Sequence, residues 1–222
     1  AGANSIAIGV NTYTTKAATN AVALGYTAQA FKQDALALGT NAYTNGQNSI
    51  AMGTRANVIT GDNAIAIGTD TKSYNGPNVI LGRLASAGTL ATYTDPISGN
   101  STTHHSGLNV AIGISSNAIS YDYLKPDGTY QKTGSATALG AFANATGGGS
   151  PLALGDQARA HGFNSVAIGG NANSAGTQAD GDYSMALGAG AKATKASSNG
   201  VAVGNGALVS ANNAFAFGVS AA

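Results

Sequence analysis

The chain has 222 residues, of which 32 are glycine, and it contains no cysteine and no tryptophan. Charged residues make up only 9% of it, and the net charge of +1 is too small for a nucleic-acid-binding protein. The lack of cysteine excludes a disulfide scaffold, and the use of Asp without any Glu disfavours a helical protein. With 43% hydrophobic residues, the chain still has enough apolar surface for a packed fold.

An apolar-Ala-apolar-Gly motif recurs thirteen times along the chain, with Ala replaced in a single copy. Most motif glycines follow the previous one after 14 to 16 residues, and three longer intervals of 31, 27 and 19 residues mark insertions. Self-similarity at a fixed period is typical of a solenoid, in which each repeat forms one coil. The motif glycines are Gly9, Gly25, Gly39, Gly53, Gly68, Gly82, Gly113, Gly140, Gly155, Gly169, Gly188, Gly204 and Gly218.

Each repeat predicts two short strands. The three residues before the motif Gly alternate large, small, large, and after the Gly small residues alternate with polar ones, as in Ala28-Gln29-Ala30. The Gly suits a bend between the strands, and an Asn or Asp five residues before it, as at Asn20 and Asp34, suits a tight left-handed turn. We therefore expect an all-β fold, a parallel β-roll whose 14-residue coils stack strand upon strand.

The motif strands carry no charge on either face, so we expect both faces to be buried. One face can meet the second strand of the same coil, and the other needs a partner, for which a closed ring of identical subunits is the usual solution. We expect the large residues, such as Ile65 and Ile67, to fill the inside of the roll opposite the small Ala residues of the second strand. Alternation alone leaves open which face meets the partner.

Three segments read Asn-Ser-apolar-Ala-apolar-Gly, namely Asn4–Gly9, Asn48–Gly53 and Asn164–Gly169. They resemble the YadA-like head repeat of trimeric autotransporter adhesins, and the resemblance covers nearly the whole chain outside the insertions. It implies a left-handed parallel β-roll that forms a homotrimer on the surface of Gram-negative bacteria. It also implies adhesion to host matrix proteins, host cells, other bacteria or surfaces. Neither a catalytic residue nor a cofactor nor a metal is expected from it.

We treat residues 1–222 as a single head domain that is a fragment of a longer chain, because no basic neck, heptad stalk or membrane anchor is recognisable. We expect other segments to hold it to the outer membrane, and we expect this segment to contact neither membrane nor nucleic acid. Five repeats lack the turn Asn, and we expect their turns to be rebuilt. The replacing residues are Pro77, Leu108, Ser135, Ser150 and Tyr183.

The first insertion spans about residues 83–108 and contains the pair His104 and His105. Two adjacent histidines raise the possibility of a metal site, in which a threefold axis would gather one His from each chain. Neighbouring side chains of an extended strand point to opposite faces, so they do not easily bind one ion together. We favour a solvated polar loop.

The second insertion spans about residues 114–135 and predicts a β-hairpin, because alternating segments flank the turn signal Pro126-Asp127-Gly128. Tyrosines are good contact residues, so the two longer insertions are candidate surfaces for contact with a ligand. Packing of the hairpin over the roll or over a neighbouring subunit is the alternative. The candidate contact residues are Tyr93, Tyr121, Tyr123, Lys125, Tyr130 and Lys132.

The third insertion spans about residues 170–183 and includes Asp180 and Asp182, which could suggest calcium. The repeat lacks the calcium-binding nonapeptide pattern, so we favour a turn. The presumed outward positions of the second strands are rich in amides and could adhere through many weak contacts, or could simply be solvated. These positions are Arg55, Asn57, Gln157, Arg159, Asn171, Asn173 and Lys192.

Three rival functions remain. The first is a purely structural spacer in a surface fibre. The second is an acyltransferase of the hexapeptide-repeat type, which the period of 14 disfavours; His161 also lies in a turn, where the repeat places no acid to orient it as a general base. The third is an ice-binding solenoid, which would need a ladder of Thr that the outward positions lack.

Overall fold

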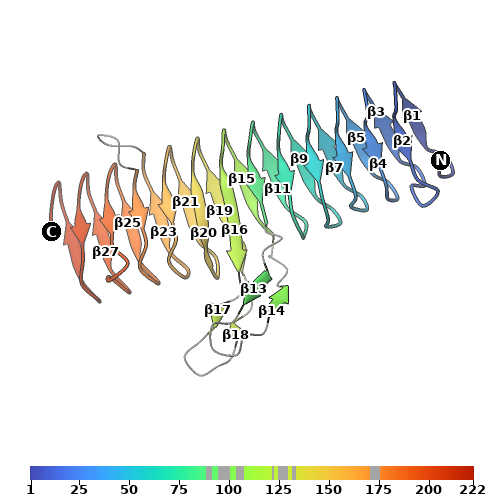
Figure 1. The fold of residues 1–222 in the computed structure, drawn as a ribbon. Helices are drawn as coiled ribbons and strands as arrows, with labels where there is room; N and C mark the ends of the chain where they lie inside the picture. The colour runs from blue at the N-terminus through green and yellow to red at the C-terminus, as the bar shows by residue number, and fades with distance from the viewer. Residues whose placement is uncertain are drawn as a thin grey trace.

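The computed structural model describes residues 1–88, 92–94, 101–103, 108–121, 123–124, 130–131, 134–170 and 176–222. Every regular element in these ranges is a β-strand. The strands stack into a slender roll with the two chain termini at opposite ends (Figure 1). None of the described residues belongs to a helix that is long and apolar enough to cross a membrane.

The motif residues form a 13-stranded parallel sheet, which we call the motif sheet. Each strand pairs with the next so that equivalent residues of successive coils lie side by side, as Ala23 does with Ala37. In order along the roll its strands are β1 (Ile6–Ile8), β3 (Val22–Leu24), β5 (Leu36–Leu38), β7 (Ile50–Met52), β9 (Ile65–Ile67), β11 (Val79–Leu81), β15 (Val110–Ile112), β19 (Thr137–Leu139), β21 (Leu152–Leu154), β23 (Val166–Ile168), β25 (Met185–Leu187), β27 (Val201–Val203) and β29 (Phe215–Phe217).

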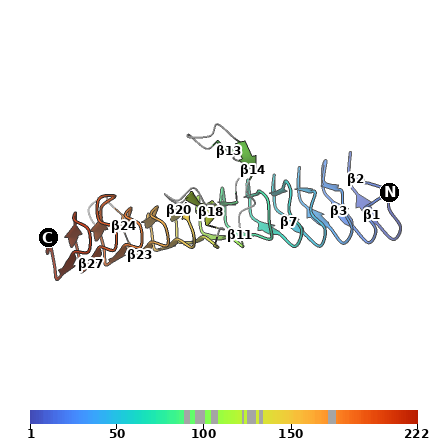
Figure 2. The ribbon, with the colours of Figure 1, turned by 90° about the horizontal axis from the view of Figure 1, so that it is seen from below.

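The residues after each motif Gly form a 12-stranded sheet on the other side of the roll, which we call the second sheet. Its strands are β2 (Tyr13–Thr14), β4 (Gln29–Ala30), β6 (Tyr43–Thr44), β8 (Asn57–Val58), β10 (Lys72–Ser73), β12 (Ser86–Ala87), β16 (Asn117–Tyr121), β20 (Asn144–Gly148), β22 (Arg159–Ala160), β24 (Gln178–Ala179), β26 (Lys192–Ala193) and β28 (Leu208–Val209). The expected all-β roll with two parallel strands per coil is therefore confirmed, and Figure 2 shows the coils from below.

The motif glycines make the bend between the two strands, and they all have positive φ, between 121° and 148°. They also stack directly on one another. A Cβ on Gly39 would lie 2.6 Å from the carbonyl oxygen of Gly53, and one on Gly53 would lie 2.6 Å from that of Gly68. Both the backbone conformation and the close stacking of coils therefore exclude a side chain here.

The Asn turn is confirmed, because the residues five before the motif Gly have φ between 50° and 59° wherever they are Asn or Asp. The expectation of a rebuilt turn is wrong at Tyr183, which has the same left-handed φ of 55°. A second left-handed position, two residues after the motif Gly, is not anticipated by the sequence analysis. It is occupied by Asn11, Thr27, Asn41, Arg55, Asp70, Leu84, Ser115, Phe142, Gln157 and Ser220.

The inside of the roll is filled by small side chains, which corrects the expected orientation of the motif strands. Ala66 is fully buried, whereas Ile65 and Ile67 on either side of it are only partly buried and lie on the outer face. A three-residue strand can point either its middle residue or its two outer residues inward. The second strand already contributes two inward residues, such as Ala56 and Val58, so only the small middle residue fits in the narrow interior.

The insertion boundaries also differ from the expected ranges, because roll strands lie inside them. The chain completes β12 before it departs in the first insertion and β16 before it departs in the second, and in the third the extra residues precede β24. Residues 83–88, 114–121 and 178–183 thus belong to regular coils or their turns.

Candidate functional site

Two antiparallel strand pairs lie beside the middle of the roll. The first joins β13 (Thr92–Thr94) to β14 (Ser101–Thr103), and the second joins β17 (Tyr123–Leu124) to β18 (Tyr130–Gln131). Both pairs stand on the same side of the roll (Figure 1). The predicted strand pairing of the second insertion is confirmed, whereas the first insertion, expected as a loop, also contains a strand pair.

The structure places four of the six candidate contact residues on or next to these strand pairs. Tyr93 lies in β13, Tyr123 in β17 and Tyr130 in β18, and Tyr121 ends the roll strand β16. The others, Lys125 and Lys132, lie outside the described residues, as do His104 and His105. A contact role for all six stays a prediction.

A buried pair of asparagines joins the coils on either side of the first insertion. Asn78 and Asn109 are fully buried and precede β11 and β15, at the position where the other coils have Ser, Ala, Gly or Pro. Asn109 Nδ2 donates to Asn78 Oδ1 at 3.1 Å, and Asn78 Nδ2 donates to Ser73 Oγ at 3.1 Å and to the carbonyl of Tyr74 at 2.5 Å. These bonds satisfy buried polar groups at the point where the chain leaves and re-enters the roll.

The same network reaches the coil that follows the second insertion. Asn109 Oδ1 accepts hydrogen bonds from Ser120 Oγ at 2.9 Å and from the backbone N–H of Ala136 at 3.0 Å. Ser120 lies in β16, which pairs with β20 over five residues from Asn117 to Tyr121, longer than other strands of the second sheet. The base of each insertion is thus held by buried hydrogen bonds that the sequence analysis missed. The sequence does carry a signal for this network, namely Asn at a position where the other coils have a smaller residue.

The outer side of the motif sheet is a continuous apolar surface, which we call the apolar face. It consists of the two outer residues of each motif strand, which are all large and apolar except Thr137, and none of them is charged. They are partly buried along most of the roll and more exposed in a few coils, as at Leu24 (39%) and Leu139 (40%). An apolar surface of this extent is unusual for a monomer and indicates an interaction surface.

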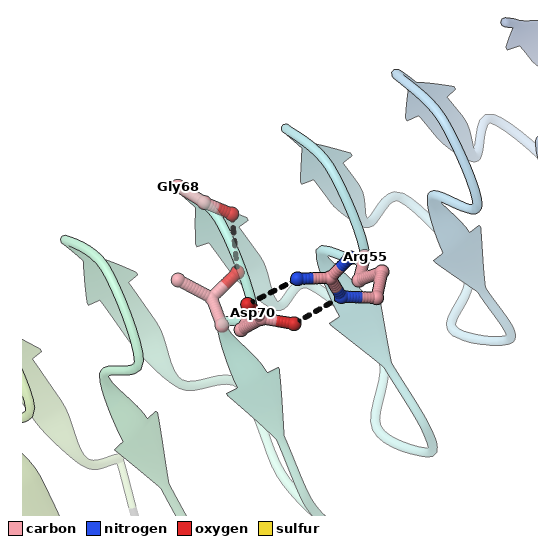
Figure 3. Close-up of polar contacts among 4 residues, drawn as sticks. Arg55, Gly68 and Asp70 are labelled. Carbon is pink, nitrogen blue, oxygen red and sulfur yellow. Dashed lines mark hydrogen bonds and ion pairs between the residues drawn. The ribbon is translucent and has the colours of Figure 1, made fainter.

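The outer side of the second sheet is mostly polar, with aromatic side chains on its first coils and an ion pair at its edge. Arg55 Nε and Nη2 donate hydrogen bonds to the two carboxylate oxygens of Asp70 at 2.5 and 2.7 Å (Figure 3). In the same coil as Asp70, the hydroxyl of Thr71 donates a hydrogen bond to the carbonyl oxygen of Gly68. The hydrogen bond from Arg55 lowers the pKa of Asp70, and Asp70 raises the pKa of Arg55. Because both residues face solvent, the pair adds little to stability.

The predicted outward positions divide into three groups. Asn57, Arg159 and Lys192 lie on strands of the second sheet, as expected. Arg55 and Gln157 instead occupy the left-handed turn before the strand, with φ of 55° and 57°. The remaining two, Asn171 and Asn173, lie outside the described residues.

Sequence comparison identifies these coils. The YadA head domain repeat (2 copies) matches residues 1–28, 17–42, 32–56, 60–75, 152–172, 160–179, 179–198 and 196–221, which together cover more than half of the chain. The chain belongs to the YadA head family. That family is an adhesin-type, non-enzymatic family of bacterial surface proteins. No curated protein matches the chain in sequence.

The matches to the YadA head repeat stop before residue 76 and resume at residue 152. The intervening stretch contains both strand pairs and the Asn78–Asn109 network. Coil geometry continues through this stretch, because β11, β15 and β19 pair in the same register as the matched coils. The two strand pairs of this YadA head are therefore additions to a roll that continues unbroken through the unmatched stretch.

A histidine and an acid of this YadA head lie together in adjacent coils. His161 Nδ1 is 3.2 Å from Asp180 Oδ1, so the expectation that no acid accompanies His161 is wrong. Contact with His161 lowers the pKa of Asp180, against the opposing effect of partial burial. The other ring nitrogen, Nε2, is buried and has no hydrogen-bond partner among the described residues, so it is not presented to a substrate. The pair links two turns.

The Asp180–Asp182 segment is likewise occupied by internal contacts. Asp182 Oδ1 accepts a hydrogen bond from the backbone N–H of Phe163 at 2.9 Å, and Asp180 faces His161. Within the ranges that the structure describes, no three His, Cys, Asp or Glu residues are grouped so that they could hold a metal ion. The two aspartates therefore have roles in joining coils.

Proposed function

We propose that this chain is the head of a homotrimeric autotransporter adhesin that attaches a bacterium to host matrix proteins, host cells, other bacteria or surfaces. Membership of the YadA head family supports adhesion as the activity. The single observation that carries the assembly is the apolar face, which runs along the motif sheet without a charge. Left-handed coiling and attachment to the outer membrane through other segments belong to the same proposal.

The apolar face supports a homotrimer because a parallel sheet is normally covered on both sides. The second sheet covers the inner side through fully buried small residues such as Ala30 and Ala160. Identical partners that contribute the same apolar face would cover the outer side, and a closed ring leaves none of these faces exposed. The polar side of each roll then faces outward, where a target can reach it.

We propose the two hairpins as the contact region for the target, with Tyr93, Tyr121, Tyr123, Lys125, Tyr130 and Lys132 as contact residues. Support comes from their place on an addition to the repeat and from the suitability of Tyr for contacts. Three copies around a shared axis would add avidity to weak single contacts. The alternative is a structural spacer, in which the roll only holds other domains away from the cell.

Beads coated with the chain test adhesion directly. Attachment is counted on collagen, on fibronectin, on cultured epithelial cells, on bacterial cells and on bare glass. A matched variant lacks residues 122–131, which include both strands of the second hairpin, and light scattering measures the oligomeric state of both proteins. We expect a trimer in both cases, and attachment to at least one target that falls at least tenfold in the deletion variant.

Each alternative has its own outcome in this experiment. Attachment to none of the targets by a trimeric protein would support the structural spacer. Undiminished attachment of the deletion variant would show that the second hairpin is not the contact region. A monomeric intact chain would contradict the assembly.

A further inference from the structure

Three aromatic rings from the first three coils lie together on the outer side of the second sheet: Tyr13 and Tyr43 occupy equivalent positions in the first and third coils, and Phe31 lies beside them in the second. We call Tyr13, Phe31 and Tyr43 the aromatic stripe. The ring centroids of Tyr13 and Phe31 are 5.9 Å apart, and those of Phe31 and Tyr43 are 5.2 Å apart. All three rings are partly or largely accessible, and Tyr13 is 53% exposed. They lie on the opposite side of the roll from the apolar face, so a partner on that face would not cover them.

Neutral amide side chains accompany the aromatic stripe. Gln29 lies in register between Tyr13 and Tyr43, and Asn57 is the neighbour of Tyr43 on the next coil. These side chains are partly accessible. An amide offers both hydrogen-bond donors and an acceptor; Asn57 can offer only its Nδ2 donors here, because its Oδ1 is buried. The surface therefore combines flat apolar rings with groups that can bind hydroxyls.

Two lysines border the aromatic stripe on one edge. Lys16 and Lys32 are exposed and occupy equivalent positions in adjacent coils, because Thr14 pairs with Ala30 two residues earlier. Both lysines lie two residues beyond paired strands, and neighbouring parallel strands are about 4.8 Å apart along the roll. The ion pairs of the described residues include neither lysine, and like charges side by side repel each other. A carboxylate bound between them would relieve this repulsion.

We propose that the aromatic stripe, with Lys16 and Lys32, is a binding surface for an acidic polysaccharide. The C–H faces of pyranose rings stack on the negative faces of aromatic rings, sugar hydroxyls bond to Gln29 and Asn57, and carboxylates pair with the lysines. The regular spacing of the coils suits a polymer of repeating units. The proposal rests on the proposed function only in that a trimer presents three such surfaces. It does not depend on the hairpins.

Oligogalacturonate and its methyl ester provide a matched pair of probes, because they share one sugar backbone and differ in charge. Binding of each to the intact 222-residue chain is measured by biolayer interferometry at two salt concentrations. The variants are Tyr43→Ala, Phe31→Ala and the double variant Lys16→Gln with Lys32→Gln. Tyr26→Ala is the control, because Tyr26 is 54% exposed but lies in the turn after Gly25, away from the aromatic stripe.

We expect the acidic probe to bind more tightly than the ester, with a loss of roughly tenfold for each aromatic variant, a size typical of stacking on an aromatic side chain. The lysine variant should bind acid and ester equally and lose its salt dependence. Tyr26→Ala and the chain without residues 122–131 should bind as the intact chain does. Circular dichroism and light scattering verify that each variant is folded and has the oligomeric state of the parent.

Three results would overturn this proposal. The first is equal binding of acid and ester by the intact chain. The second is unchanged binding in the aromatic variants. The third is capture of single-stranded DNA or of a collagen-like peptide by the aromatic stripe without any binding of oligogalacturonate. None of these results bears on the bead assay, since the hairpin deletion and the oligomeric state are measured separately there.

Discussion

Gly53 shows how one position is constrained in two independent ways. Its φ of 129° is a conformation that L side chains rarely adopt, and a Cβ would meet the carbonyl of Gly68 in the next coil. Gly170 is a useful contrast, because a Cβ added to it would meet no atom of the described residues within 4 Å. The first glycine is required by the stacking of coils, whereas the second is not.

Replacement of Gly53 by Ala should therefore lower the free energy of unfolding by at least about 2 kcal/mol, because strain and steric overlap add together. Gly170→Ala should change it by less than about 0.5 kcal/mol. Urea unfolding followed by circular dichroism measures both. Equal effects of the two substitutions on the free energy of unfolding would contradict a specific requirement for glycine at position 53.

Asp180 gives the roll an acid-sensitive contact. Its pKa in the folded protein is lowered by His161, so its carboxylate stabilises the fold above the ordinary Asp pKa of about 3.9. That stabilisation is lost as the pH falls through the lower folded-state value. We expect Asp180→Asn to cost about 1 kcal/mol at pH 5 and progressively less toward pH 2. Thermal unfolding across this range provides the measurement, and a constant difference would contradict it.

At the residue scale, the sequence predicted the turns at those positions where the backbone conformation permits few residue types. The motif Gly and the turn Asn were recognisable because left-handed backbone favours Gly and Asn. The second left-handed position carried no such signal, since it holds Arg55, Leu84 and Phe142 among others. There the exposed turn accepts many side chains, and the stacking of coils sets the backbone.

The hairpins depend on an element of the roll that is not itself repetitive. Asn78 and Asn109 occupy an interior position that holds a smaller residue, mostly Ser or Ala, in the other coils, and together they satisfy buried groups in three successive coils. Both insertions leave the roll within these coils. The hydrogen bonds thus fix the coils from which the hairpins extend.

Asn109→Ala should destabilise the protein by about 2–4 kcal/mol, because it leaves Ser120, the N–H of Ala136 and Asn78 Oδ1 with fewer buried partners. Asn144→Ala is the matched control. Asn144 lies on β20 and its Oδ1 has no hydrogen-bond partner among the described residues, so the same substitution should be nearly neutral. Melting temperatures of the two variants compare them, and a similar loss in both would contradict a special role for Asn109.

Prediction at the scale of elements succeeded where local patterns are strong. Alternation around Pro126-Asp127-Gly128 indicated the second hairpin, and β17 pairs with β18 as expected. The strands of the first insertion, β13 and β14, consist mostly of Thr and Ser and carry no alternation of apolar and polar residues. The buried Asn network joins residues far apart in sequence, which no local pattern reveals.

The whole molecule presents two unlike faces, and their assignment was the main error of the sequence analysis. Alternation gave the strands and their parallel stacking but could not say which side of a motif strand points inward. The narrow space between the two sheets decides this, since it accepts Ala66 and excludes Ile65 and Ile67. The large residues are consequently available for contacts between chains.

Two adjacent substitutions separate folding from assembly. Ala66→Asp places a charge in the closed interior, at a cost of several kcal/mol, and should abolish folding. Ile67→Asp places the charge on the apolar face, so the chain should keep its β-type circular dichroism but no longer form a trimer by light scattering. Lys72→Asp, on the exposed side of the second sheet, should leave both properties intact. A trimeric Ile67→Asp protein with unchanged melting would contradict an interface on the apolar face.

The backbone hydrogen bonds between coils run along the length of the roll, from one parallel strand to the next. A cell held by this head in flowing liquid would load those bonds in tension along their own direction. Every pair of adjacent coils transmits the load, and a terminal coil, which pairs with a neighbour on one side only, would detach first, so the chain would unfold one coil at a time. Each released coil of 14 residues would lengthen the tether by roughly 45 Å, given about 3.3 Å per extended residue. Because the coils are stacked and do not interlock, the roll would take up a sudden load by lengthening in steps of one coil.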